Sequence, residues 1–118
     1  MKREKIVQDI KQSTTNIPGI QVIMYGSEAR GDAREDSDID LLILVDKDKV
    51  SYDDEVTITS PIYDIELKYG VIISCNVMPK KSWTERPFNT PYYLNVEREG
   101  VVLWKILTKK TVKHWYNI

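Results

Sequence analysis

Short apolar runs alternate with amphipathic segments along this chain of 118 residues. Apolar positions recur at helical spacing over residues 2–14, and this pattern predicts an amphipathic helix. Residues 20–25 (IQVIMY) form a short β-branched run between chain-breaking residues, which predicts a buried strand. Residues 38–45 are again mostly apolar and predict a second strand.

The second half of the chain continues this alternation. Residues 53–69 predict a helix that Pro61 breaks or kinks, and residues 71–78 predict a third strand. Residues 80–90 are expected as loop or short helix, and residues 91–99 as a last helix that Gly100 caps. Helices alternating with three short strands indicate an α/β (α+β) fold, with a small mixed sheet of three or more strands flanked by helices.

The length of the chain allows one compact domain and is too short for two ordinary ones. Residues 1–118 are therefore predicted as a single domain, whose last residues, 105–118, form a basic and aromatic tail of unassigned structure. The single cysteine, Cys75, excludes an internal disulfide, and the charged N-terminus has no apolar signal core. These features predict a cytoplasmic protein.

The charge balance limits the classes of partner. The formal net charge is −1, so no overall positive field gathers nucleic acid or an anionic membrane. Nucleic acid remains open only as a local substrate. The longest apolar run, residues 39–45, contains Asp40 and is far too short to span a membrane, so no membrane association is expected.

A Gly-Ser turn follows the first predicted strand. Gly26 allows a sharp turn and a close approach of a ligand to the backbone. Ser27 is expected to cap a short helix that ends at Arg30, where its hydroxyl joins the N–H groups at the helix N-terminus. Such a helix start favours an anion, typically phosphate. The alternative is an ordinary strand–helix turn.

Two aspartates stand one residue apart where the second strand begins. Asp38 and Asp40 are expected on one side of the strand, about 6.5–7 Å apart along it. Beside an apolar run, two ionised carboxylates repel each other and are costly to bury, and a shared cation removes both problems. Oxygen ligands suit Mg²⁺ or Mn²⁺. The alternative is a pair of solvated aspartates.

Together these residues resemble the signature of a known family. Gly26-Ser27, Ala29-Arg30-Gly31 and the run from Ser37 to Leu41 (SDIDL) resemble the minimal nucleotidyltransferases, in the polymerase-β-like superfamily. A weaker likeness to the end of such domains covers residues 95–103 (NVEREGVVL). The resemblance implies the polymerase-β-like fold, metal binding and catalysis by Asp38 and Asp40, and nucleotide binding by Gly26, Ser27, Arg30 and Ser37.

The resemblance also implies an activity and a partner. Such enzymes use Mg²⁺ or Mn²⁺ to move a nucleoside monophosphate from ATP or another nucleoside triphosphate to a hydroxyl acceptor. Domains of this kind are often paired with a helical HEPN-type protein in a toxin–antitoxin system, where they act as the antitoxin.

One feature of the family is missing. Its members usually carry a third carboxylate on the next strand, but residues 71–78 contain no Asp or Glu, and Asn76 offers only a neutral oxygen. The nearest upstream carboxylates, Asp64 and Glu66, are expected as solvated positions of the preceding helix. The alternative function is therefore a catalytically impaired module of the same fold that binds nucleotide or protein.

Overall fold

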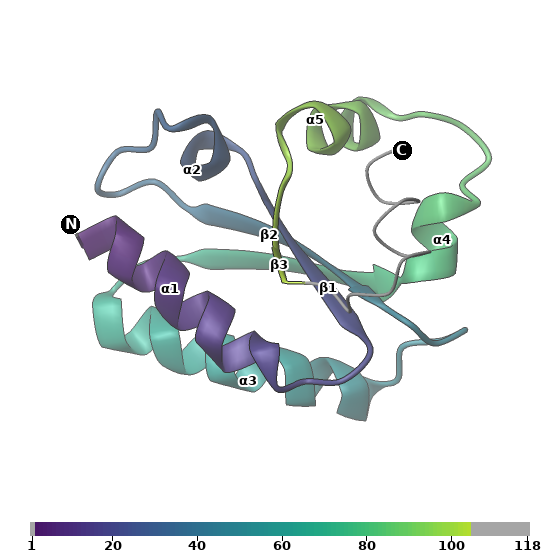
Figure 1. Ribbon diagram of the computed structural model, residues 1–118, viewed down its shortest axis with the longest axis horizontal. Coiled ribbons are helices and arrows are strands. Elements are labelled where there is room, and N and C mark those ends of the chain that lie inside the picture. The colour runs from purple at the N-terminus through teal and green to yellow at the C-terminus, as the bar shows by residue number, and fades with distance from the viewer. Residues whose placement is uncertain (1, 105–118) are drawn as a thin grey trace.

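The computed structural model describes residues 2–104 (Figure 1). The predicted tail, residues 105–118, lies outside the described residues. The elements in chain order are α1 (Lys2–Thr15), β1 (Ile20–Tyr25), α2 (Ser27–Arg30), β2 (Ile39–Val45), α3 (Tyr52–Tyr69), β3 (Ile73–Pro79), α4 (Lys80–Thr84), α5 (Pro91–Glu99) and β4 (Val101–Trp104).

The four strands form one mixed sheet in the order β3-β2-β1-β4. Strand β1 runs antiparallel to both β2 and β4, whereas β2 and β3 are parallel. Parallel neighbours need a crossover connection, and α3 supplies it. The structure thus confirms the predicted mixed sheet with flanking helices and adds a fourth strand at the edge next to β1.

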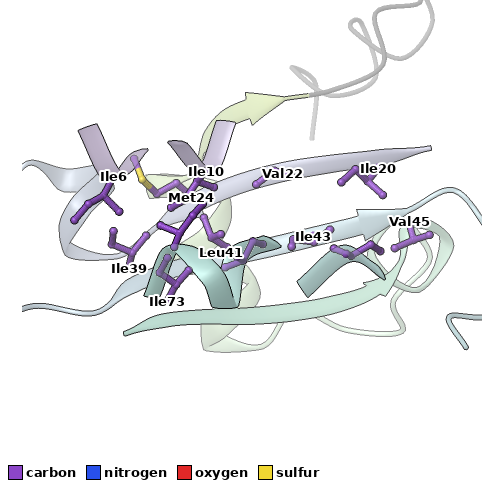
Figure 2. Close-up of a cluster of buried hydrophobic side chains, with 13 residues drawn as sticks. Ile6, Ile10, Ile20, Val22, Met24, Ile39, Leu41, Ile43, Val45 and Ile73 are labelled. Atoms are coloured by element: carbon purple, nitrogen blue, oxygen red, sulfur yellow. The ribbon is translucent and has the colours of Figure 1, made fainter. Parts of the chain in front are cut away.

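Helices cover the two faces of the sheet. Helices α1 and α3 lie along one face, and α4 and α5 lie on the other (Figure 1). Residues of β1 and β2 alternate between the two faces, so both strands are buried on both sides. Figure 2 shows the larger core, formed by isoleucines of α1 and α3 against the sheet residues Ile20, Val22, Met24, Ile39, Leu41, Ile43, Val45 and Ile73.

Helix α3 begins and ends at defined caps. Ser51 and Asp54 form a capping box, in which each side chain accepts the other residue's backbone N–H. Gly70 closes the helix in the left-handed conformation. The helix is continuous through Pro61, so of the two predicted outcomes the break is wrong, and the kink stays a prediction. Buried isoleucines on both sides of the proline, including Ile58 and Ile62, hold both halves of the helix against the sheet.

Gly100 caps α5 as expected, but for a different reason. Its φ of −62° and ψ of 134° are open to any residue. A Cβ at this position would instead crowd the carbonyl oxygen of Val96 and lie 2.9 Å from Cγ2 of Ile23. The glycine therefore allows α5 to turn into β4 while staying packed on β1. Within residues 2–104, no helix combines the length and apolarity needed to cross a membrane.

The core predicts a contrast between two apolar truncations. Ile43 is fully buried in β2, and Ile43→Ala should lower the free energy of unfolding by roughly 2–5 kcal/mol. Phe88→Ala, at an exposed position, should change it by less than about 0.5 kcal/mol. Urea denaturation followed by circular dichroism measures both values, and equal midpoints would contradict the described core.

Candidate functional site

The chain turns sharply where β1 meets α2. Gly26 has φ 78° and ψ −157°, a region of backbone space that essentially only glycine occupies. A Cβ at Gly26 would overlap Oδ2 of Asp40 on the neighbouring strand. The missing side chain therefore allows the Gly-Ser turn and the Asp40 carboxylate to lie in direct contact.

The two predicted aspartates lie beside this turn. Asp40 is in β2, opposite Tyr25 in the antiparallel register, and Asp38 directly precedes the strand. Asp40 shares the sheet face of Leu42 and Leu44, which α4 and α5 cover. Burial and the Asp38 charge raise the pKa of Asp40, and Arg30 partly opposes this shift. Keeping both carboxylates ionised therefore costs free energy in the folded state, and a bound cation would lower this cost.

The predicted cap at Ser27 is wrong. Gly26 is the N-cap of α2, and no side chain accepts a hydrogen bond there. Because Gly26 takes up the sharp turn, the helix starts one residue earlier than expected and Ser27 becomes its first residue. The predicted end of the helix at Arg30 is confirmed, with Gly31 as a left-handed C-cap.

Arg30 and the turn are both held by Glu99, at the end of α5. One nitrogen of Arg30, Nη1, donates to both carboxylate oxygens of Glu99 at 3.1 Å, and Nε donates to Asp32 at 3.1 Å. The backbone N–H of Gly26 also donates to Oε2 of Glu99, at 3.3 Å. These contacts of Glu99 could not be predicted from the sequence, where its only signal is its place in the family-like stretch 95–103.

Neutral groups occupy β3 next to the aspartates. Ser74 is in register with Asp40, and Asn76 is in register with Leu42 on the same face. Asn76 Nδ2 donates to the Tyr92 hydroxyl at 3.0 Å. Within residues 2–104, no three His, Cys, Asp or Glu side chains cluster to hold a metal. On the β3 side, the aspartates therefore have only neutral neighbours among the described residues.

Asp64 and Glu66, the two carboxylates of α3 that precede β3, lie in environments that differ from that of the aspartate pair. Asp64 is exposed, as expected. The prediction that Glu66 is a solvated position is wrong, because its Oε2 is half-buried and accepts the backbone N–H of Ile73 at 2.7 Å. Glu66 secures the start of β3 from the α3 face of the sheet, away from Asp40.

Two tyrosines form a wall of the site that the sequence did not reveal. The rings of Tyr25 and Tyr92 meet edge to face, with centroids 5.5 Å apart. Burial first, then the contact with Tyr92 and the charge of Asp40, raises the pKa of Tyr25, so its phenol stays protonated. The only sequence signal for Tyr25 is its place immediately before Gly26.

The loop between α2 and β2 is fixed from two sides. The Ser37 hydroxyl accepts the backbone N–H of Arg34 at 2.8 Å, so it closes the loop just before Asp38. Arg3 of α1 is buried, donates to Glu28 at 2.7 Å, and donates to the carbonyl oxygen of Glu35 at 3.1 Å. The predicted nucleotide contact of Ser37 stays a prediction, whereas the supporting role of Arg3 was missed.

Comparison with known proteins places this site in a family. Residues 3–89 match the family model of the nucleotidyltransferase domain. "Putative protein adenylyltransferase MJ0604" of Methanocaldococcus jannaschii is 37% identical over 84 residues, which cover 71% of this chain and 77% of that protein. MJ0141 of the same organism, which bears the same designation, is 34% identical over 103 residues, covering 82% of this chain and 97% of that protein.

Solved structures share the fold. A crystal structure of a toxin–antitoxin with AMP-PNP superposes with a TM-score of 0.55 at 19% identity, covering 97% of this chain and 77% of that one. A mutant of the toxin–antitoxin MntA-HpeT gives a TM-score of 0.56 at 18% identity, covering 96% of this chain and 78% of that one. The likeness confirms the predicted fold.

The contact between Gly26 and Asp40 predicts a matched pair of substitutions. Gly26→Ala should lower the free energy of unfolding by roughly 1–3 kcal/mol through backbone strain, with further loss from the overlap with Asp40. Gly31→Ala also places a side chain at positive φ, but no atom lies within 4 Å of its Cβ. Gly31→Ala should therefore lower the free energy of unfolding by less than Gly26→Ala does, and it should leave the amide resonances of β2 unchanged. Urea denaturation and NMR measure both effects; equal losses would contradict the contact.

The raised pKa of Asp40 predicts a pH-dependent effect of Asp40→Asn. At pH 7 the ionised carboxylate is costly in the folded state, so the variant should melt at a temperature equal to or above that of the unmodified protein. As the pH falls through the raised pKa of the folded state, Asp40 gains its proton in the folded protein before it does so in the unfolded chain. The difference in melting temperature between the variant and the unmodified protein therefore shrinks. Thermal melts at pH 7 and pH 4 test this, with Asp48→Asn as an exposed control. A variant that is less stable at pH 7 would refute it.

Proposed function

The chain belongs to the nucleotidyltransferase domain family, and from this premise we propose that it transfers a nucleoside monophosphate from a nucleoside triphosphate to a hydroxyl acceptor, with Mg²⁺ or Mn²⁺ as cofactor. The acceptor oxygen forms a bond to the α-phosphorus as the bond from that phosphorus to the β-phosphate oxygen breaks. Pyrophosphate leaves, and the hydroxyl proton passes to solvent.

One observation carries the proposal: Gly26 lies against the carboxylate of Asp40. A triphosphate that follows the backbone of the Gly-Ser turn would reach the aspartates directly. Phosphoryl transfer depends mainly on positioning and on neutralising negative charge, so this proximity is the geometry that the reaction needs.

The donor set fits a hard divalent cation. Asp38 and Asp40 offer only oxygen atoms, and the pKa of Asp40 is raised by burial and by the neighbouring charge. Mg²⁺ is commonly held by one or two carboxylates while water and substrate phosphates complete its shell. When bound, the metal supplies charge neutralisation at the reacting phosphate and the leaving pyrophosphate.

Protein groups around the pair take the remaining roles. The Ser27 hydroxyl is not used in capping and would contact the triphosphate. Arg30, held in place by Glu99, would place its positive charge near the phosphates. Ser37 fixes the loop before Asp38 and so sets the position of that carboxylate. The phenol of Tyr25 stays neutral and adds no further negative charge beside Asp40.

A hydroxyl on a partner protein is the acceptor that we infer. The two archaeal relatives bear the designation of protein adenylyltransferases, which favours ATP as the donor and a protein as the acceptor. Solved structures of the same fold are toxin–antitoxin proteins. We therefore propose a toxin–antitoxin role, in which this chain modifies a helical HEPN-type partner.

The second candidate is a module that binds nucleotide or protein without efficient transfer. The observation in its favour is Ser74, which stands opposite Asp40 on the strand where the family usually has a carboxylate. Two carboxylates can hold one metal ion, but the third would be needed to hold a second firmly. The two candidates make different predictions for the same assay.

Transfer of label from nucleotide to protein tests the proposal. The purified chain is incubated with ATP, CTP, GTP or UTP labelled at the α-phosphate, with Mg²⁺ and a co-expressed partner protein. Asp38→Asn should reduce incorporation about a hundredfold or more, because a charged metal ligand is lost. Asp48→Asn, an exposed aspartate after β2, is the matched control and should leave incorporation unchanged.

The outcomes separate the two candidates. Label on the partner that depends on Asp38 and Mg²⁺ supports the transferase. Calorimetric binding of the Mg²⁺–nucleotide complex without label transfer supports the binding module. No heat with any Mg²⁺–nucleotide mixture would refute the transferase and a nucleotide-binding module, and it would leave only a protein-binding module.

A further inference from the structure

Large apolar side chains are exposed along one face of α3. The helix buries Ile58, Ile62 and Ile65 against the sheet, yet its far side carries a row of apolar residues at helical spacing. We name this row the α3 stripe: Tyr52, 79% exposed; Val56, 41%; Tyr63, 58%; and Leu67, 67%. An apolar row of this length on a surface helix is characteristic of a protein interface.

The stripe is symmetric about its own centre. Tyr52 and Leu67 lie equally far along the chain from the midpoint between Thr59 and Ser60, and so do Val56 and Tyr63. If a second, identical helix lies antiparallel to the first, Val56 of each copy meets Tyr63 of the other. Tyr52 then meets Leu67 in the same way. Self-complementarity of this kind is the requirement for a two-fold interface.

We propose that the α3 stripe binds a second copy of this chain, through an antiparallel pair of α3 helices related by a two-fold axis. Thr59 and Ser60 lie at the centre of the pair. Because both side chains are small, the two helix axes can approach to about 8–10 Å, the usual packing distance. The large residues on either side then pack around this crossing.

The edge of the sheet beside α3 supports the same partner. Strand β3 is the outermost strand, and among residues 2–104 no strand pairs with its outer side. Exposed edges are normally protected by charged residues or bulges, yet residues 71–78 carry no charge. A cavity of about 410 Å³ lies between β3 and α3, lined in part by Val56, Tyr63 and Cys75, and offers space to an apolar side chain of the second copy.

The charges of α3 favour the antiparallel arrangement. Its first turn is acidic, with Asp53, Asp54 and Glu55, whereas its last turn carries Glu66 and Lys68 and has no net charge. Antiparallel pairing brings the acidic turn of each helix toward the neutral last turn of the other, and the two helix dipoles oppose each other. A parallel pair would instead place the two acidic turns together.

The exposed area predicts a weak dimer. The stripe would bury roughly 350 Å² of apolar side chain per copy, from typical side-chain areas. Two copies then bury about 700 Å², and this area belongs to the range of weak, transient interfaces below ~1,200 Å². A concentration-dependent equilibrium between monomer and dimer is therefore expected.

Analytical ultracentrifugation of the full chain tests the stripe. The unmodified protein should approach twice the monomer mass as its concentration rises, while Tyr63→Asp and Leu67→Asp should weaken the dimer tenfold or more. Phe88→Asp is the matched control, since Phe88 is 69% exposed away from the stripe, and it should dimerise normally. Circular dichroism confirms that every variant is folded. A purely monomeric protein, or stripe variants that dimerise normally, would overturn the proposal.

Cross-linking tests the register. In a Cys75→Ser background, Ser60→Cys lies next to the two-fold axis, so mild oxidation should yield a disulfide-linked dimer. Ser82→Cys, an exposed serine of α4, should yield none. Equal cross-linking at both positions would contradict the symmetric pairing. If the chain is monomeric and the stripe variants lose binding to a different protein, the stripe is the interface for that protein. This outcome would refute the proposed pairing with a second copy.

Discussion

The close contact between Gly26 and Asp40 is the constraint on which the site depends. Two strands of six and seven residues carry the turn and the carboxylate, and their antiparallel register puts Tyr25 opposite Asp40. Any side chain at position 26 would occupy the space of the carboxylate. Glycine therefore serves both the strained backbone of the turn and its contact with Asp40, and in the proposed function it would also let a phosphate approach the backbone. The same contact leaves Asp40 partly desolvated beside Asp38, which creates the demand for a cation.

The scaffold around this contact is rigid for identifiable reasons. Strands β1 and β2 are buried on both faces, and a slip of β2 by one residue would turn Asp40 into the larger apolar core. Strand β4 pairs with β1 and brings the end of α5 to the turn, where Glu99 bonds both Gly26 and Arg30 (Figure 1). The Gly26 N–H therefore donates to a carboxylate oxygen of the chain itself.

Sequence reasoning succeeded where the signal is local. Periodicity located β1 and α5 to the residue, and the glycine and aspartate spacing located the turn and the acidic pair. It failed at the capping role of Ser27 and at the possible break at Pro61, because the capping position depends on the conformation of Gly26 and the continuity of α3 depends on buried neighbours. The contacts of Glu99 and Tyr92 could not be predicted from the sequence, because each joins segments far apart in the chain.

The absence of a carboxylate from residues 71–78 changes the electrostatics of the proposed reaction. With two carboxylates the site is less negative, so it repels a triphosphate less and binds one cation without a third ligand. A second cation would be held mainly by substrate oxygens and only weakly by the protein. Activation of the acceptor hydroxyl then depends more on how accurately that hydroxyl is positioned. A small domain with little surface for an acceptor gains that accuracy when a second polypeptide presents the hydroxyl, which connects the composition of β3 to the inferred protein partner.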